Sequence, residues 1–252
     1  MIAPGSDMFA CAALVEKGDP ARFRTVMAAP LAARLRLFPL YAFNVEVARA
    51  PYLTTEPMIA EMRLQWWRDV LAEIAEGGRV RRHEIATPLA ATLSPDQARA
   101  LDALVTARQW DCYKDPFEDD AHLHRYLAAS SGLLMRTAAE LLGGPAEAAS
   151  HAGLGLGVAN WLRAAPALEK MRRIPLVDGT ADGIRGLART GLAALDAARG
   201  PVPRPALPAF WPATGARRVL RVAEAEPGRV ADGTLPAPSR MPLAFAAALG
   251  RW

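Results

Sequence analysis

Residues 38–69 read FPLYAFNVEVARAPYLTTEPMIAEMRLQWWRD, and this stretch decides the fold class. In its first half, Phe38, Ala42, Val45 and Arg49 follow one another at the spacing of three and four that is typical of one helix face. The second half repeats that spacing after a proline, and it carries two adjacent tryptophans among charged residues. The stretch therefore predicts two helices that are unusually rich in aromatic and charged side chains.

The same spacing and similar start signals recur along the chain. Asp19-Pro20, Ser94-Pro95 and the pair Thr55 and Pro57 are typical of helix starts, and Gly77-Gly78 is typical of a helix end. Pro39 is expected to bend its helix. The predicted helices cover residues 7–17, 20–27, 31–50, 57–76, 95 onward, 120–142, 145–163, 182–198, 214–224 and 239–249, with Ser239 as the cap of the last, and residues 200–213 form a proline-rich connection that helix cannot cross.

The length and composition fit one helical domain. With 252 residues, of which 52% are hydrophobic, the chain can bury a sizeable core, and we expect a single domain over residues 1–252. There is no alternating strand pattern of useful length and no internal repeat. The predicted class is all-α, a single-domain helical bundle.

No segment of the chain predicts membrane insertion or export. Its apolar runs are interrupted well before the roughly 20 residues that a membrane-spanning helix needs, and the start MIAPGSDMFACAALVEK lacks a basic region before its apolar run. We therefore expect a soluble, cytoplasmic protein. Cys11 and Cys112 are far apart and outside any CxxC pattern, so we expect two reduced, buried thiols.

The charge is mildly basic and arises mostly from arginine. The formal net charge is +4 and the sequence pI is about 9.4. Small arginine clusters, such as those around Arg81 and Arg218, favour solvated helix faces, although they would also suit phosphate or an anionic lipid surface. No nucleic-acid-binding motif accompanies them, so no nucleic-acid partner is predicted. Peripheral membrane contact stays open, but no strongly amphipathic basic helix argues for it.

Other catalytic patterns are weak. His122 and His124 are two residues apart, about 200° around a helix, so they do not form a metal pair on one face. His83 and His151 are isolated, and the acidic run that ends at Asp120 favours capping at a helix start. There is no GxSxG, P-loop or GxGxxG motif. No catalytic residue and no metal ligand is assigned from these patterns.

Two motifs together resemble the squalene/phytoene synthase family. LYAFN at 40–44 and MRLQWWRD at 62–69 are similar to the family's LYAFCR and LxxWWRDEL, which flank an aspartate-rich DDxxD segment. Residues 151–177 resemble its GxALQLTNILRDVxED helix and the GRxYLP-like turn after it, with Asn160, Leu162 and Arg163 in matching places. The resemblance implies the helical bundle of the isoprenoid synthases.

The carboxylates of that family are replaced in this sequence. Synthases of this type hold Mg²⁺ between carboxylates one helical turn apart, and the ions stabilise the diphosphate that leaves. The proline that accompanies each replaced motif is expected to break its helix, Pro51 in the first and Pro166 in the second. Where the resemblance expects carboxylates, the chain carries Ala48, Arg49 and Tyr52 in the first motif and Ala164 and Leu168 in the second.

The segments in which this sequence differs from the synthase motifs resemble one branch of the superfamily. AFNVEVA, MRLQWWRD and ANWLRAAP look like the branch that includes the mitochondrial respiratory complex I assembly factor 6, over roughly residues 20–177. This resemblance implies a scaffold without catalysis or cofactor, with complex I subunits or assembly intermediates as partners, peripheral to the inner membrane, and with a retained apolar pocket for an isoprenoid. The alternative is an active prenyltransferase that condenses isoprenoid diphosphates with Mg²⁺ held by other residues.

The resemblance to the family also implies which residues would surround a retained pocket. Arg49 and Arg163 are the candidates for contact with an anion, and Tyr41 and Trp67 are the candidates for its apolar wall. An equally good interpretation is that the two arginines pair with Glu46, one turn from Arg49, or with solvent, and that Asn44 and Asn160 cap or bridge helices. The full set of pocket candidates is Tyr41, Asn44, Glu46, Arg49, Trp67, Asn160 and Arg163.

Overall fold

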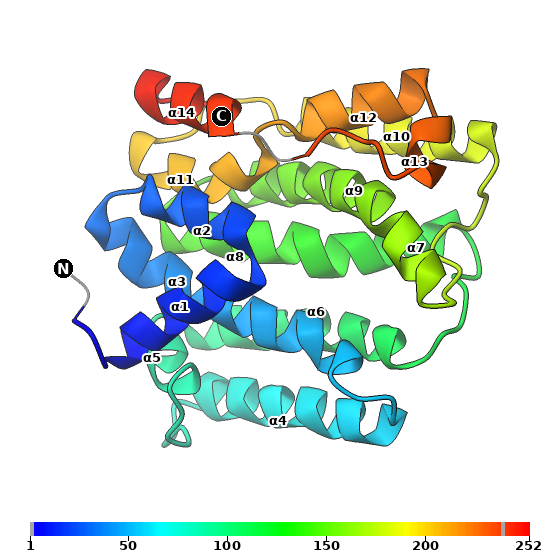
Figure 1. The fold of residues 1–252 in the computed structure, drawn as a ribbon. Coiled ribbons are helices and arrows are strands. Elements are labelled where there is room, and N and C mark those ends of the chain that lie inside the picture. The colour runs from blue at the N-terminus through cyan, green and yellow to red at the C-terminus, as the bar shows by residue number, and fades with distance from the viewer. Residues whose placement is uncertain (1–2, 238–239) are drawn as a thin grey trace.

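The structure is a computed structural model that describes residues 3–237 and 240–252, and Figure 1 draws it as a ribbon. Within these residues the regular elements are all helices, so the all-α prediction is confirmed. The single-domain organisation stays a prediction. In chain order the elements are α1 (Asp7–Gly18), α2 (Pro20–Met27), α3 (Leu31–Arg49), η1 (Ala50–Tyr52), α4 (Pro57–Ala75), α5 (Ala86–Ala90), α6 (Pro95–Gln109), η2 (Trp110–Cys112), α7 (Asp120–Leu127), η3 (Ala128–Gly132), α8 (Leu133–Leu141), α9 (Ala146–Lys170), α10 (Ala181–Ala197), η4 (Arg204–Ala206), α11 (Leu207–Phe210), η5 (Trp211–Ala213), α12 (Ala216–Ala225), α13 (Gly228–Ala231) and α14 (Arg240–Leu249).

The long helices lie side by side, with α9 in the middle of the bundle (Figure 1). Successive neighbours are α4, α6, α8, α9, α10 and α12, and α1 packs across α3. The main core draws buried apolar side chains from α1 through α13. Its largest fully buried side chains include Phe38, Tyr41 and Phe43 of α3 and Phe210 of α11. The first half of residues 38–69 is therefore buried in the core, whereas Met58 and Met62 of α4 are exposed.

Most predicted helix ends are confirmed by their hydrogen bonds. Asp19 accepts from the Arg22 amide at 2.9 Å, and Ser94 forms a capping box with Gln97. The prediction that Thr55 starts α4 is wrong, because Glu56 occupies the cap position and no side chain caps this helix. The predicted cap Ser239 lies outside the described residues.

Two predicted segments differ in detail from the structure. The proline-rich connection at 200–213 contains three short helical turns, η4, α11 and η5. Each has its proline in the first turn, where the backbone N–H has no partner within the helix, so proline is tolerated there. The helix predicted over 120–142 contains a π-helical segment, η3, between α7 and α8. A π segment of this kind widens the turn and is frequent at functional sites.

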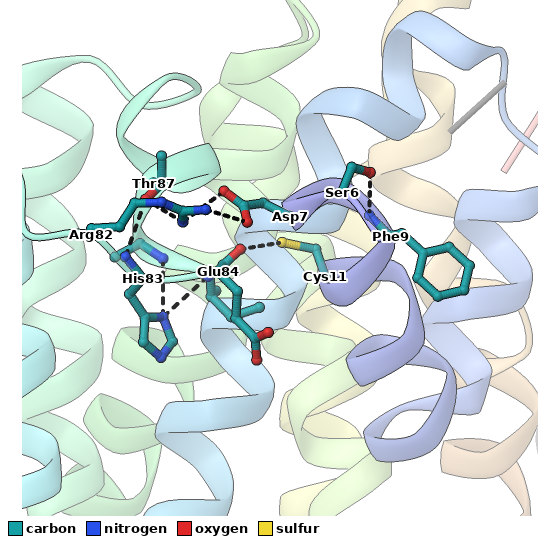
Figure 2. A network of polar contacts seen from close by, with 10 residues as sticks. Ser6, Asp7, Phe9, Cys11, Arg82, His83, Glu84 and Thr87 are labelled. Carbon is teal, nitrogen blue, oxygen red and sulfur yellow. Dashed lines mark hydrogen bonds and ion pairs between the residues drawn. The ribbon is translucent and has the colours of Figure 1, made fainter. Parts of the chain in front are cut away.

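Polar contacts hold α1 against the loop that precedes α5 (Figure 2). Arg82 pairs with Asp7, with 2.8 Å between nitrogen and oxygen. The Cys11 thiol donates to the Glu84 carbonyl at 3.8 Å. The Nδ1 atom of His83 accepts from the Ile85 amide at 3.1 Å, so this histidine orders the loop backbone.

Both cysteines are buried free thiols, as the sequence predicted. Burial, together with the nearby Asp7 and Glu84 charges, raises the pKa of Cys11 to about 12. Burial also raises the pKa of Cys112 to about 11. Of the helices in the described part of the chain, none combines the length and apolarity needed to cross a bilayer.

Candidate functional site

A cavity of about 220 Å³, here called the central cavity, brings together segments that are far apart in the sequence. It lies among α2, α3, η1, α6, α7, η3, α8 and α9. None of the described residues that line it is an aspartate or a glutamate. They are Arg22, Asn44, Tyr52, Arg108, Tyr126, Leu127, Ser130, Ser131, Leu134, Gly157, Asn160, Trp161, Ala164 and Leu168.

The end of α3 shapes one wall of the central cavity. The α-helix stops at Arg49, and Pro51 lies in the 3₁₀ turn that follows, which confirms the predicted break. Arg49 Nη2 lies 2.5 Å from Glu46 Oε1, so these two side chains neutralise each other one turn apart. Tyr52 then lines the cavity at the end of this turn.

Another wall of the cavity is α9, which runs without interruption through Pro166 to Lys170. The prediction that Pro166 breaks this helix is therefore wrong. A proline inside a helix removes the hydrogen bond to the carbonyl four residues earlier, but α9 also packs on α8 and α10 over much of its length. That packing holds the helix, and Ala164 and Leu168 line the cavity one turn apart.

A cluster of three polar side chains lies beside the cavity. The Tyr126 hydroxyl donates to Asp111 Oδ2 at 2.8 Å, and Arg108 Nη1 donates to the same oxygen at 3.1 Å. Arg108 also donates to the Tyr126 hydroxyl. The side chain of Asp111 is only 3% exposed, so the cluster is closed to solvent on the carboxylate side.

This cluster keeps the guanidinium charged. Burial alone lowers the pKa of Arg108, but the adjacent Tyr126 and Asp111 outweigh it, and the net pKa is raised. Burial raises the pKa of Tyr126 well above its usual value, so the hydroxyl stays protonated. The Nε atom of Arg108 is buried and has no hydrogen-bond partner among the described residues. This N–H is therefore closed off by the packed side chains around it.

The π-helical segment supplies two serines to the cavity lining, and their hydroxyls have different surroundings. Ser130 donates to the Tyr126 carbonyl at 2.7 Å. The Ser131 hydroxyl is buried and lacks a partner among the described residues. Gly157 of α9 faces Ser131 so closely that a Cβ there would lie 2.9 Å from Ser131 Cβ. The absence of a side chain at Gly157 lets α9 approach η3 at this wall.

Arg22 of α2 also lines the central cavity. Its Nη1 atom lies 2.5 Å from Asp19 Oδ2, so this charge is paired as well. The guanidinium carbon lies 5.6 Å from the centre of the Tyr41 ring. Burial raises the pKa of Tyr41 to about 12, so its phenol stays neutral while its ring packs against the Arg22 guanidinium.

A second cavity, of about 290 Å³, lies on another face of α9, and Arg22 and Asn160 line both cavities. Arg24, Arg163 and Arg218 also line it. Arg163 Nη1 donates to Asn160 Oδ1 at 3.2 Å, and burial lowers the pKa of Arg163.

The structure brings together only part of the predicted site. Asn44 and Asn160 line the central cavity, and Arg163 lines the second one. Tyr41 and Trp67 are buried, and Trp67 packs on Phe43 with 5.4 Å between ring centres. The interpretation that Glu46 and Arg49 pair with each other is confirmed. Their roles toward a ligand stay predictions.

Sequence reasoning missed the polar groups that α6, η2, α7 and η3 contribute. Arg108 and Asp111 are three residues apart, which is the usual spacing of a surface ion pair. Tyr126 and Ser131 lie in a helical pattern without a motif. The one available signal was the polar pair Ser130-Ser131 inside an otherwise apolar helical stretch, which is unusual for a helix interior.

The residues present do not fit the Mg²⁺ ions that the fold family uses. Divalent magnesium prefers carboxylate and other oxygen ligands, whereas the described lining offers two guanidinium groups and no carboxylate. Within the described residues, no three His, Cys, Asp or Glu side chains gather as a ligand set. The Asp111 carboxylate already accepts from Arg108 and Tyr126.

Comparison with solved structures supports the fold. A crystal structure of a dehydrosqualene synthase in complex with ligand superposes with a TM-score of 0.76 at 14% identity, over 97% of this chain and 95% of that chain. The squalene synthase HpnC from Alicyclobacillus acidocaldarius superposes with a TM-score of 0.71 at 18% identity, over 92% of this chain and 95% of that chain. At these identities the similarity shows the shared helical fold.

Sequence comparison finds relatives that are described as assembly factors and not as synthases. The Drosophila melanogaster homolog of NADH dehydrogenase (ubiquinone) complex I, assembly factor 6, is 32% identical over 170 residues, which cover 62% of this chain and 50% of the homolog. The chain spans about half the length of the curated relatives it matches. The profile of the family described as "Squalene/phytoene synthase" matches residues 15–177. Because that match covers more than half of the sequence, and the fold agrees with it, the chain belongs to the squalene/phytoene synthase family.

Proposed function

We propose that this protein acts in the assembly of respiratory complex I, and that it does so without metal-dependent prenyl transfer. Relatives from Drosophila melanogaster and Bos taurus, 32% and 26% identical, carry the description of complex I assembly factor 6. The partners would be complex I subunits or assembly intermediates, and the place of action would be the cytoplasmic side of the inner membrane, peripheral to the bilayer.

One observation carries the non-catalytic part of this proposal. Tyr52, Ala164 and Leu168 all line the central cavity, and these are positions at which the family resemblance expects carboxylates. A prenyl diphosphate ionises when Mg²⁺ neutralises the leaving group. A cavity walled by a phenol, a methyl group and an isobutyl group offers no ligand for such an ion at these positions.

The complex I role is tested by deleting the gene in its own organism. We expect the amount of assembled complex I on a native gel to fall, and the wild-type gene to restore it. Carotenoid and hopanoid levels should stay normal in the same strain. Unchanged complex I in a clean deletion would overturn the assembly role.

The chemical part is tested on the purified protein. Farnesyl and geranylgeranyl diphosphates are titrated by calorimetry with and without Mg²⁺, and the mixtures are then extracted for hydrocarbon products. We expect no Mg²⁺-dependent binding and no product. Mg²⁺-dependent binding with product would instead support the alternative function, an active prenyltransferase of the squalene or phytoene synthase type.

A further inference from the structure

The second cavity is lined by arginines from three helices. Arg22 and Arg24 belong to α2, Arg163 belongs to α9 and Arg218 belongs to α12. The helix α12 packs along α9 (Figure 1), and η5 contacts both α2 and α9. Among the described residues that line this cavity, none belongs to α3 and none is at position 48, 49, 52, 164 or 168. The second cavity therefore lies apart from the positions at which the family resemblance expects metal-binding carboxylates.

Positive charge exceeds negative charge in this lining. The one carboxylate in the described lining is that of Asp19, which lies 2.5 Å from Arg22 Nη1, so these two side chains neutralise each other. Every aspartate and glutamate of the chain is among the described residues, and none of them forms an ion pair with Arg24, Arg163 or Arg218. Three arginines therefore line one small cavity without a counter-ion.

The guanidinium groups of these arginines are accessible to a ligand. Arg24 and Arg163 are half-buried, and among the described residues neither of them has a nitrogen that is both buried and without a partner. Arg163 Nη1 donates to Asn160 Oδ1 at 3.2 Å, and because Asn160 also lines the cavity, this contact holds the guanidinium at the cavity wall. Arg218 is exposed at the same cavity. The unpartnered N–H groups of these side chains therefore keep an accessible surface, unlike Arg108 Nε.

The hydroxyl groups of the lining are already used within the protein. Thr25 donates to the Arg22 carbonyl at 2.7 Å, and Thr214 donates to the Trp211 carbonyl at 2.7 Å. Much of the remaining wall is apolar, and its buried members include Leu156, Trp211 and Val219. The cavity thus combines unpaired cations with an apolar wall, an arrangement that suits an anionic group attached to a carbon framework.

A phosphate monoester matches the charge of this cavity better than a carboxylate does. Near neutral pH it carries about two negative charges and three acceptor oxygens, whereas a carboxylate carries one charge. Guanidinium groups bind phosphate oxygens through paired, charge-assisted hydrogen bonds. The volume of about 290 Å³ is at the small end of ligand sites, so it suits a phosphate with a few carbon atoms.

We propose that the second cavity binds a phosphate monoester without metal, through the guanidinium groups of Arg24, Arg163 and Arg218. A free phosphorylated metabolite and the phosphate of a lipid headgroup share this chemistry, and the two arms of the test below separate them. The site goes beyond the assembly role proposed above, because it concerns a small anion and not a protein partner.

The first arm of the test uses phenyl phosphate, with benzoate as its matched control. Both compounds carry an anionic group on the same apolar ring, and only the first is a phosphate. They are titrated by calorimetry into the purified protein at one fixed ionic strength in the presence of EDTA. We expect saturable binding of one phenyl phosphate, with benzoate weaker by about tenfold or more because it offers less charge and fewer acceptor oxygens.

The second arm uses lipid vesicles in a flotation assay, again with EDTA. One set contains phosphatidylcholine alone, and the other contains equal amounts of phosphatidylcholine and phosphatidic acid, whose headgroup is a phosphate monoester. Binding of phenyl phosphate in solution without vesicle binding would assign a free phosphate monoester. Retention on the phosphatidic acid vesicles that Arg163→Gln abolishes would assign a lipid headgroup. Either result supports the proposed phosphate site.

Three variants locate the site. Arg163→Gln and Arg218→Gln each remove one guanidinium, and we expect each to weaken the binding of phosphate by about tenfold or more. The control is Arg63→Gln, which makes the same change of net charge at an exposed residue of α4 outside the cavity and should bind as the wild type does. Without phosphate, Arg163→Gln should melt no lower than the wild type, because the charge that it removes is half-buried and has no counter-ion. A purely structural arginine would instead lower the melting temperature when replaced.

Three results would overturn the proposal. The first is that neither phenyl phosphate nor the phosphatidic acid vesicles bind in EDTA. The second is that benzoate binds as tightly as phenyl phosphate, which would show that the cavity does not distinguish a phosphate. The third is that Arg63→Gln weakens binding as much as Arg163→Gln does, which would show a response to net charge alone. None of these results depends on complex I levels in the deletion strain, so the two proposals fail separately.

Discussion

The hydroxyl of Tyr126 and the carboxylate of Asp111 meet at 2.8 Å, in a place where the carboxylate has almost no exposure to water. They come from α7 and η2, and Arg108 of α6 completes the contact. Because each of the three side chains is hydrogen-bonded to the other two, they are expected to act as a unit. Arg108 and Tyr126 also line the central cavity, so this unit fixes part of the cavity wall.

Replacing Asp111 with alanine should strongly destabilise the protein. The change leaves the Arg108 guanidinium in a largely buried place without its carboxylate, a loss that costs about 3–5 kcal/mol. Urea denaturation measures the free energy of unfolding. The control is Asp182→Ala, because Asp182 pairs with Arg185 at the same sequence spacing but is 92% exposed. The control should unfold as the wild type does, and equal stability of the two variants would refute the buried pair.

Gly153→Ala should destabilise the protein, and Gly186→Ala should not. At Gly153 a Cβ would lie 2.5 Å from the Ser131 carbonyl oxygen and 2.9 Å from Gly132 Cα, so the backbone of η3 or α9 must move, at about 1–3 kcal/mol. At Gly186 of α10, nothing lies within 4 Å of the added methyl group. There the higher helix propensity of alanine should raise the free energy of unfolding by up to about 1 kcal/mol. Thermal melts of the two variants distinguish these outcomes.

The two thiols should resist alkylation in the native protein. The pKa is about 12 for Cys11 and about 11 for Cys112, so very little thiolate is present near about pH 8. Mass spectrometry after iodoacetamide treatment should find neither thiol modified in buffer and both modified in urea. Rapid labelling of either cysteine under native conditions would contradict its buried position.

Stability should fall in alkaline solution. The pKa of Cys11 rises from 9.0 to about 12 and that of Tyr41 from 10.0 to about 12, both chiefly through burial of the neutral form. For a group whose pKa is raised by folding, the stabilisation is complete below the unfolded pKa and is lost as the pH rises toward the folded one. Each group should cost about 1.4 kcal/mol per pH unit within this window. Urea midpoints that stayed constant from about pH 8 to about pH 11 would contradict this expectation.

The sequence predicted most helices because their signals are local. Caps at Asp19 and Ser94 and the positive φ angle of Gly77 after α4 all occur where the residue types indicate them. The failures concern places where packing outweighs a local preference. Pro166 lies inside α9, and the π segment interrupts a helical pattern that shows no local signal for it.

The site was less predictable than the fold, because its groups meet only through packing. The pairing of Glu46 with Arg49 followed from spacing along one helix. The pairing of Tyr126 with Asp111 requires α7 to lie against η2, and no spacing rule specifies that contact. Arg22 reaches the same cavity from α2, and only the three-dimensional structure reveals it.

In α9 the residues that position the helix differ from the side chains at 164 and 168 that line the cavity. Gly153 meets the backbone of η3 and Gly155 meets α10, so close contacts at positions without a side chain set the position of this helix. Ala164 and Leu168 line the cavity from the same helix, some two turns further along. Exchanging these lining side chains need not move the helix, since they are not what positions it. A scaffold of this kind can lose one chemistry, and acquire another, while its architecture persists.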